Sequence, residues 1–124
     1  MTMILLVEDE VMLASVMQAS LEDGGFSVAW LGDGESAIRA LEDSIDSISA
    51  LLTDIRLPDE ITGWDIARRA RALRPDLPVI YMSGDSASAW TAHGVPRSIM
   101  LQKPFASAQL VTAIASLLNE AAAY

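Results

Sequence analysis

The chain has 124 residues, of which 52% are hydrophobic and 20% charged, and it contains no cysteine. This composition is typical of one globular domain, expected to span residues 1–124, and it excludes intrinsic disorder, disulfide frameworks and thiolate metal sites. The formal net charge of −9 disfavours direct binding to nucleic acid or anionic lipid, because phosphates are bound by clusters of Lys and Arg, and it suits a metal cation or a basic protein surface instead.

No segment has the features of a membrane span or a secretory signal peptide. A span needs about 20 consecutive apolar residues, and no apolar run in the chain reaches that length. The apolar run at residues 4–7 is followed at once by Glu8, Asp9 and Glu10, and no basic residue precedes it. We therefore expect a cytoplasmic protein with neither nucleic acid nor membrane among its partners.

Short apolar runs alternate with helical patterns along the chain. Apolar runs at residues 4–7, 26–31, 48–53, 79–82 and 99–101 predict five strands. Apolar side chains at helical spacing predict helices over 11–21, 36–43, 64–73 and 107–122, and a weaker helix of small residues over 86–93. Five strand–helix units in succession predict an α/β fold, with a doubly wound five-stranded parallel sheet and helices on both faces.

Residues that carry chemistry follow four of the predicted strands. They are Glu8-Asp9 after the first, Asp54 after the third, Ser83-Gly84 after the fourth and Lys103-Pro104 after the fifth. In a parallel α/β sheet the ligand site lies beyond the carboxyl ends of the strands. We therefore expect three carboxylates, one hydroxyl and one lysine to meet at one edge of the sheet.

This set of groups indicates phosphoryl chemistry assisted by a metal. Three carboxylates in one small site raise one another's pKa, and a hard divalent cation relieves that conflict. Mg²⁺ prefers carboxylate oxygens and water as ligands. Lys103 and Ser83 are then available to bind an anion such as phosphate. A carboxylate nucleophile, here Asp54, beside Mg²⁺ and opposite a lysine is suited to forming an aspartyl phosphate.

In this order, and each at the end of a predicted strand, these residues resemble the receiver domain of bacterial two-component response regulators. The residues that carry the resemblance are Val7-Glu8-Asp9, Asp54, Pro58, Ser83-Gly84 and Lys103-Pro104-Phe105. It covers essentially the whole chain. It implies the flavodoxin-like strand order 2-1-3-4-5. It also implies a phosphoacceptor signalling domain rather than an enzyme, with only self-phosphotransfer and autodephosphorylation as its chemistry.

The resemblance implies which residues accept the phosphoryl group and bind the metal. Asp54 would accept the group from the phosphohistidine of a sensor histidine kinase or of a histidine phosphotransfer protein. Asp9, Asp54 and the backbone carbonyl of Arg56 would bind Mg²⁺ directly, and Glu8 would bind it directly or through water.

The resemblance also implies how the phosphoryl group is bound. Lys103, which precedes the family's usual cis proline at Pro104, would pair with one phosphoryl oxygen. The Ser83 hydroxyl and the Gly84 backbone amide would donate to the others. Phosphorylation would then change the affinity for a downstream protein at the face formed by the fourth helix, fifth strand and fifth helix.

Two features of the whole protein are also expected. It would be a monomer or a weak homodimer. Because Met1 lies at a natural distance before the first strand, a complete small regulator is favoured over a phosphorelay intermediate or a piece of a hybrid sensor kinase.

Three features depart from the family's usual pattern. Met100 stands where the family usually has the Tyr or Phe of its aromatic switch, so packing within the strand is the favoured role of this side chain. The loop over residues 54–63 is one residue longer than the commonest pattern. The segment over residues 83–103 is short, which predicts a stunted fourth helix.

Arg56 and three tryptophans have open roles. The Arg56 side chain is either solvated or paired with Asp85. We hypothesise that such a pair controls the access of water and thereby the lifetime of the phosphoryl group. Trp30 is expected to pack on the sheet, and Trp64 and Trp90 to be partly exposed, with Trp90 a candidate contact for a partner protein.

Two alternative functions stay open. A haloacid-dehalogenase-like phosphatase also uses a carboxylate, Mg²⁺ and a lysine, but it normally has a second acid two residues after the nucleophile, where this chain has Arg56. A degenerate receiver would serve as a binding scaffold that does not depend on phosphorylation. Turnover of small phosphate esters would indicate the first alternative, and partner binding without Mg²⁺ the second.

Overall fold

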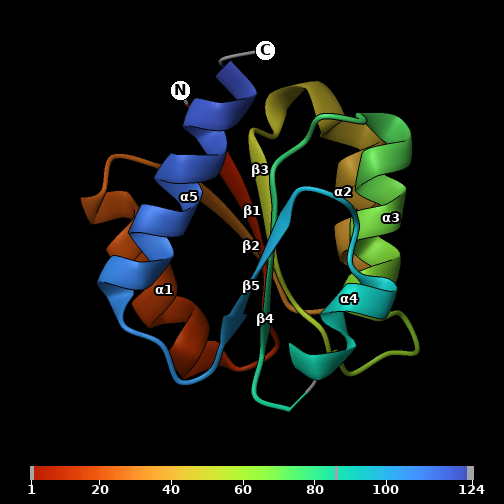
Figure 1. Cartoon of the computed structure of the whole chain (residues 1–124), viewed down its shortest axis with the longest axis horizontal. Helices are drawn as coiled ribbons and strands as arrows, with labels where there is room; N and C mark the ends of the chain where they lie inside the picture. Colours follow the sequence, from red (N-terminus) through yellow and green to blue (C-terminus); the bar gives the residue numbers. More distant parts are fainter. Residues whose placement is uncertain (1, 86, 123–124) are drawn as a thin grey trace.

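A computed structural model describes residues 2–85 and 87–122 as a five-stranded sheet with helices on both faces (Figure 1). The strands are β1 (Met3–Val7), β2 (Ser27–Leu31), β3 (Ala50–Asp54), β4 (Val79–Ser83) and β5 (Ser98–Gln102). The helices are α1 (Val11–Asp23), α2 (Gly34–Ser44), α3 (Gly63–Leu73), α4 (Trp90–His93) and α5 (Ser107–Ala122), with 3₁₀ turns η1 (Ile45–Ser47) and η2 (Ala87–Ala89). All strand pairs are parallel, in the order β2-β1-β3-β4-β5, which confirms the predicted fold and strand order.

The central strands are buried on both faces, which explains their continuous apolar sequences. Ile4 and Leu6 of β1 pack in the layer formed with α1 and α5, whereas Leu5 and Val7 pack in the layer formed with α2 and α3. Figure 1 shows these two layers on opposite sides of the sheet, with α4 on the side of α2 and α3. Both faces of the central strands are therefore covered by helices, and their carboxyl ends form an edge of the sheet where polar side chains can gather.

Local caps fix where two of the helices begin. The Asp33 side chain accepts a hydrogen bond from the Ser36 backbone N–H at 2.7 Å and caps α2. Thr62 and Asp65 form a reciprocal capping box at the start of α3, in which Thr62 Oγ1 accepts from the Asp65 N–H and Asp65 Oδ2 accepts from the Thr62 N–H. Within residues 2–85 and 87–122, every helix is too short or too polar to span a lipid bilayer.

Several predicted boundaries shift in the structure. The strand expected over 48–53 is β3, which begins at Ala50 because η1 extends the turn after α2. The helix expected over 86–93 is reduced to η2 and the single turn of α4, as the short segment predicted, and Gly94 is the C-cap of α4. The first residue of that prediction, Ser86, lies outside the described residues.

Candidate functional site

Side chains from three strand ends meet at the carboxyl edge of the sheet. The Lys103 ammonium, after β5, lies 2.8 Å from Glu8 Oε1, after β1, and 3.0 Å from Asp54 Oδ2, at the end of β3. The Glu8 side chain is 1% exposed, that of Asp54 12% and that of Lys103 21%. These three groups therefore form a largely buried set with one cation between two carboxylates.

Backbone amides hold both carboxylates in one orientation. Asp54 Oδ1 accepts a hydrogen bond from the Ile55 N–H at 2.8 Å, which leaves Oδ2 toward Lys103. Glu8 Oε2 accepts from the Glu10 N–H at 3.1 Å, which leaves Oε1 toward Lys103. The site is thus preorganised by the main chain as well as by the lysine.

Burial and pairing shift the pKa values of this set. Burial raises the pKa of the Glu8 carboxyl above its usual 4.5, and hydrogen bonds from Lys103 and the Glu10 backbone offset this only in part. Burial alone would lower the pKa of Lys103, but its hydrogen bonds to Glu8 and Asp54 outweigh burial and raise that pKa above 10.5. Lys103 is therefore a cation at neutral pH.

The acidic side chains also suit a metal ion. Glu8, Asp9 and Asp54 each offer a carboxylate oxygen within 4.8 Å of the others. Asp9 is exposed, so its carboxylate can be reached from solvent. An all-oxygen carboxylate set of this kind fits a hard divalent cation such as Mg²⁺ and lacks the nitrogen and sulfur donors that favour zinc.

The end of β4 brings Ser83 to the same edge. Ser83 is 2% exposed, and its carbonyl accepts a hydrogen bond from the Lys103 N–H at 2.8 Å, so β4 and β5 are joined beside the site. The Asp85 N–H donates to Ser83 Oγ at 3.2 Å. Gly84 is exposed, and a Cβ added there would meet no atom within 4 Å, so its backbone is open on the solvent side.

Arg56 and Asp85 form an ion pair beside the site. Arg56 Nη2 lies 3.0 Å from Asp85 Oδ2, so the pairing alternative for Arg56 is confirmed. Both side chains are more than half exposed. Such an exposed pair contributes little to folding stability.

The loop after β3 follows a path fixed by close backbone contacts. A Cβ at Gly63 would lie 2.2 Å from the carbonyl oxygen of Asp54, so only glycine allows α3 to begin so near β3. Asp59, in the middle of the loop, accepts hydrogen bonds from the backbone N–H groups of Gly34 and Glu35 at 3.1 and 2.9 Å. The loop with the extra residue is thereby tied to the start of α2.

Trp30 contacts the site in a way that sequence reasoning missed. Its indole Nε1–H donates to the backbone carbonyl of Glu8 at 2.8 Å, and the residue is 36% exposed. Trp30 thus fixes the main chain at the first acid of the site, and the expectation that it packs on the sheet is wrong, because the residue is exposed. The sequence contains no signal for this contact, because it depends on the pairing of Trp30 with Leu6 in the β1–β2 register.

Of two predictions about side chains in the core beside β4, one is wrong and one is confirmed. Trp64 is 8% exposed rather than partly exposed, because its ring packs on Tyr81 with the centroids 4.6 Å apart. Met100 lies opposite Tyr81 in the β4–β5 register and packs against the same core, as the strand-packing interpretation predicted. A buried aromatic is therefore present on β4, one strand away from the position where the family usually has one.

Comparison with known proteins identifies the family. The model of the response regulator receiver domain matches residues 4–115. The chain belongs to the response regulator receiver family. Receiver domains are signalling modules of two-component systems, and this assignment leaves the haloacid-dehalogenase alternative without support.

Three relatives show how closely the chain follows this family. The response regulator receiver protein CpdR of Brucella abortus (strain 2308) is 36% identical over 120 residues, which are 95% of this chain and 98% of CpdR. The crystal structure of a response regulator receiver protein from Sinorhizobium medicae WSM419 is 42% identical, with a TM-score of 0.94, and the match covers 97% of this chain and 96% of that one.

The third relative has a metal in its structure. The receiver domain of the sensor histidine kinase PA1611 from Pseudomonas aeruginosa PAO1 is 28% identical, with a TM-score of 0.82, and the match covers 95% of this chain and 98% of that one. That structure has a magnesium ion coordinated in its active site cleft.

Proposed function

We propose that this receiver domain accepts a phosphoryl group on Asp54 from the phosphohistidine of a sensor kinase or a histidine phosphotransfer protein. The observation that carries the proposal is the Lys103 ammonium within 3.0 Å of both Glu8 and Asp54. A carboxylate beside a fixed lysine and a second buried acid is suited to binding a metal and a phosphoryl group side by side.

Asp54 acts as the nucleophile. One of its oxygens attacks phosphorus while the P–N bond of the phosphohistidine breaks, and the bonding electron pair remains on the imidazole. The Ile55 N–H fixes the carboxylate during this step. Lys103 exchanges its contact with the Asp54 oxygen for one with a phosphoryl oxygen, and the Ser83 hydroxyl and Gly84 N–H donate to the remaining oxygens.

Glu8, Asp9, Asp54 and the backbone carbonyl of Arg56 would hold Mg²⁺. The donor set fits this ion, and the related PA1611 receiver supports the choice of metal. When bound, Mg²⁺ offsets the negative charge that gathers between the acidic side chains and the phosphoryl group.

Phosphorylation is proposed to change partner binding. The phosphoryl group adds about −1.5 to −2 charge at pH 7, and Lys103 and Ser83 interact with it only when it is present. This differential interaction shifts the equilibrium between conformations of the face formed by α4, β5 and α5, where a downstream protein binds. The domain is proposed to act in this way in the cytoplasm, as a monomer or a weak homodimer.

A titration with beryllofluoride tests the proposal against the scaffold alternative. Beryllofluoride with Mg²⁺ imitates a phosphoryl group on a carboxylate, so the wild-type protein is expected to show saturable shifts of the Ser83, Gly84 and Lys103 amide resonances. The Asp54→Asn variant is expected to show none. Equal shifts in the two proteins, or none in either, would favour a scaffold that does not use this site.

A further inference from the structure

The carboxyl-terminal part of the chain has a charge distribution unlike the rest. The chain contains 17 acidic residues, but none of them lies between residues 86 and 119. The same stretch contains the basic residues Arg97 and Lys103 and the single histidine, His93. It forms α4, the edge strand β5 and most of α5, so one edge of this acidic protein is built largely from a segment without carboxylates (Figure 1).

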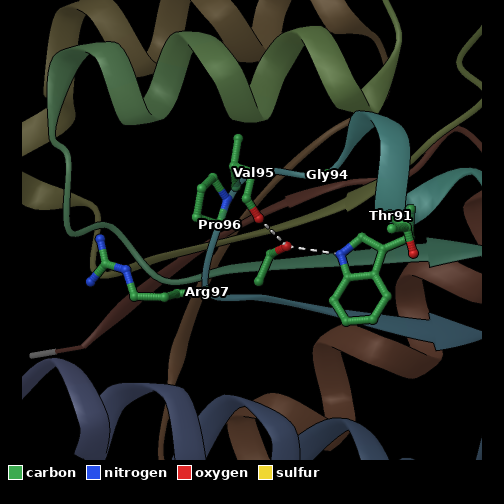
Figure 2. Close-up of a pocket in the computed structure, with 7 residues that line it drawn as sticks. Thr91, Gly94, Val95, Pro96 and Arg97 are labelled. Atoms are coloured by element: carbon green, nitrogen blue, oxygen red, sulfur yellow. Dashed lines mark hydrogen bonds between the residues drawn. The ribbon is translucent and has the colours of Figure 1, made fainter.

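A pocket opens on this edge, and we name it the α4 pocket. It is lined by Trp90, Thr91 and residues 94–98, none of which is acidic. Figure 2 shows Thr91 and Arg97 toward opposite ends of the pocket, with Val95 and Pro96 between them. The pocket therefore offers an apolar floor with a guanidinium group near one end.

Trp90 is fixed in place although it is 37% exposed. Its Nε1–H donates to Ser98 Oγ at 2.9 Å, and Ser98 Oγ–H donates to the Val95 carbonyl at 2.6 Å (Figure 2). A Cβ at Gly94 would lie 2.3 Å from Trp90 Cδ1, so the indole rests directly against the glycine backbone. Because its polar N–H is already bonded within the chain, the exposed part of this side chain is available for apolar contact.

The other end of the pocket is equally constrained. Arg97 has a left-handed backbone, with φ of 58°, and its guanidinium donates to the Pro75 carbonyl at 3.2 Å. Arg71 of α3 donates to the carbonyls of Pro96 and Arg97 at 2.6 and 3.2 Å. The nearby acid Asp76 pairs with Arg74 instead. The pocket is therefore largely preformed, which reduces the entropy lost on binding.

We propose that the α4 pocket binds a segment of a partner protein that presents an acidic residue beside a bulky apolar one. The apolar side chain packs on Trp90, and the carboxylate pairs with Arg97. The charge distribution favours this partner: an acidic segment would be repelled by most of this protein but not by residues 86–119. Exposed Trp and Arg side chains are also the types that contribute most to protein interfaces.

This inference rests on the proposed role as a partner-binding module, but it does not need phosphoryl transfer. The contacts that shape the pocket involve none of Glu8, Asp9, Asp54 and Lys103. Binding is therefore expected to persist in the Asp54→Asn variant, so that a failure of this inference and a failure of the phosphoacceptor proposal give different results.

Selection of peptides tests the proposal. A phage-displayed library of random dodecapeptides is selected on the wild-type domain and depleted on the Trp90→Ala variant, and the enriched peptides are measured by fluorescence polarisation. We expect enriched peptides to combine Asp or Glu with Leu, Ile or Phe. Their affinity is expected to fall at least tenfold for Trp90→Ala and for Arg97→Asn, since Asn tolerates a left-handed backbone and removes the charge.

Matched controls separate this result from unfolding and from other occupants. The variants Met12→Ala and Arg39→Asn change an exposed apolar side chain and an exposed arginine elsewhere, and both are expected to keep the wild-type affinity. Circular dichroism checks the fold of every variant. The proposal is overturned by basic peptides, by no enrichment, or by unchanged affinity in Trp90→Ala. Self-association that Trp90→Ala abolishes would identify a second copy as the occupant and would also overturn it.

Discussion

Trp30 donates its indole N–H to the carbonyl oxygen of Glu8, 2.8 Å away, and so connects the edge strand β2 to the first acid of the proposed phosphorylation site. The contact is made by a side chain that is one-third exposed, and it acts on the backbone rather than on the carboxylate. It orients the segment that carries Glu8 and Asp9, both of which we expect to bind Mg²⁺.

Replacing Trp30 by Phe tests this relationship. The variant keeps the ring and loses the N–H, so we expect Mg²⁺ affinity to fall about fivefold, the equivalent of one hydrogen bond worth about 1 kcal/mol. Isothermal titration calorimetry measures the affinity, and Trp90→Phe serves as the matched control with no change expected. An unchanged Mg²⁺ affinity in Trp30→Phe would show that this hydrogen bond does not position the site.

Replacing Lys103 by Met separates metal binding from phosphoryl binding. Lys103 lies between Glu8 and Asp54, so its removal takes a positive charge away from these proposed metal ligands, and we expect Mg²⁺ to bind about tenfold more tightly. The same variant is expected to lose the amide shifts that beryllofluoride induces in the wild type. Weaker Mg²⁺ binding in Lys103→Met would contradict the arrangement of charges described here.

The Arg56–Asp85 ion pair is expected to slow loss of the phosphoryl group. It stands beside the site, and we expect its removal in the Arg56→Ala, Asp85→Ala double variant to admit water and raise the autodephosphorylation rate at least threefold. The rate is measured by intact mass after the phosphodonor is removed. Because the pair is exposed, the free energy of unfolding should change by less than about 1 kcal/mol. Equal dephosphorylation rates would refute the role.

The buried phenol of Tyr81 is expected to make the free energy of unfolding depend on pH. Burial raises the pKa of its phenol above 10.0, and the hydrogen bond from the Val95 N–H offsets this only in part. The folded pKa thus exceeds the unfolded one, so the contribution of Tyr81 to stability is full below pH 10 and is lost as the pH rises through the folded value. Tyr81→Phe should remove this alkaline loss.

Urea denaturation of wild type and Tyr81→Phe at pH 7 and above pH 10 measures the effect. At pH 7 the variant is expected to be less stable by about 1 kcal/mol, because the buried Val95 N–H loses its acceptor. The difference should shrink or reverse at alkaline pH. A difference independent of pH would mean that the buried phenol does not titrate with an elevated pKa.

The sequence predicted the fold and the meeting of the acidic residues with Lys103 because both depend on local patterns. Buried parallel strands are continuous apolar runs, and the carboxyl ends of parallel strands lie at one edge of the sheet. The strand order itself was implied by the family resemblance. The contacts of Trp30 and Trp64 were not predictable in this way. They depend on strand register and on which ring lies beneath α3, and neither is encoded by the neighbouring residues in the chain.

For the fourth helix, the sequence predicted the reduced length but not the pocket that the helix helps to form. The short segment before Gly94 predicted a stunted helix, and α4 is a single turn. The bond from Trp90 to Ser98 joins α4 to β5, and Arg97, with its left-handed backbone, contacts Arg71 of α3 and Pro75 before β4. Such contacts are not encoded locally, so the α4 pocket became visible only in the structure.

Phosphorylation of Asp54 by a small-molecule donor tests the central claim most directly. The protein is incubated with acetyl phosphate or phosphoramidate and Mg²⁺, and its intact mass is measured beside that of Asp54→Asn. We predict one added phosphoryl group in the wild type, and none in the variant or when EDTA removes Mg²⁺. An adduct of equal yield in Asp54→Asn, or one that forms equally without Mg²⁺, would contradict the proposed phosphoacceptor site.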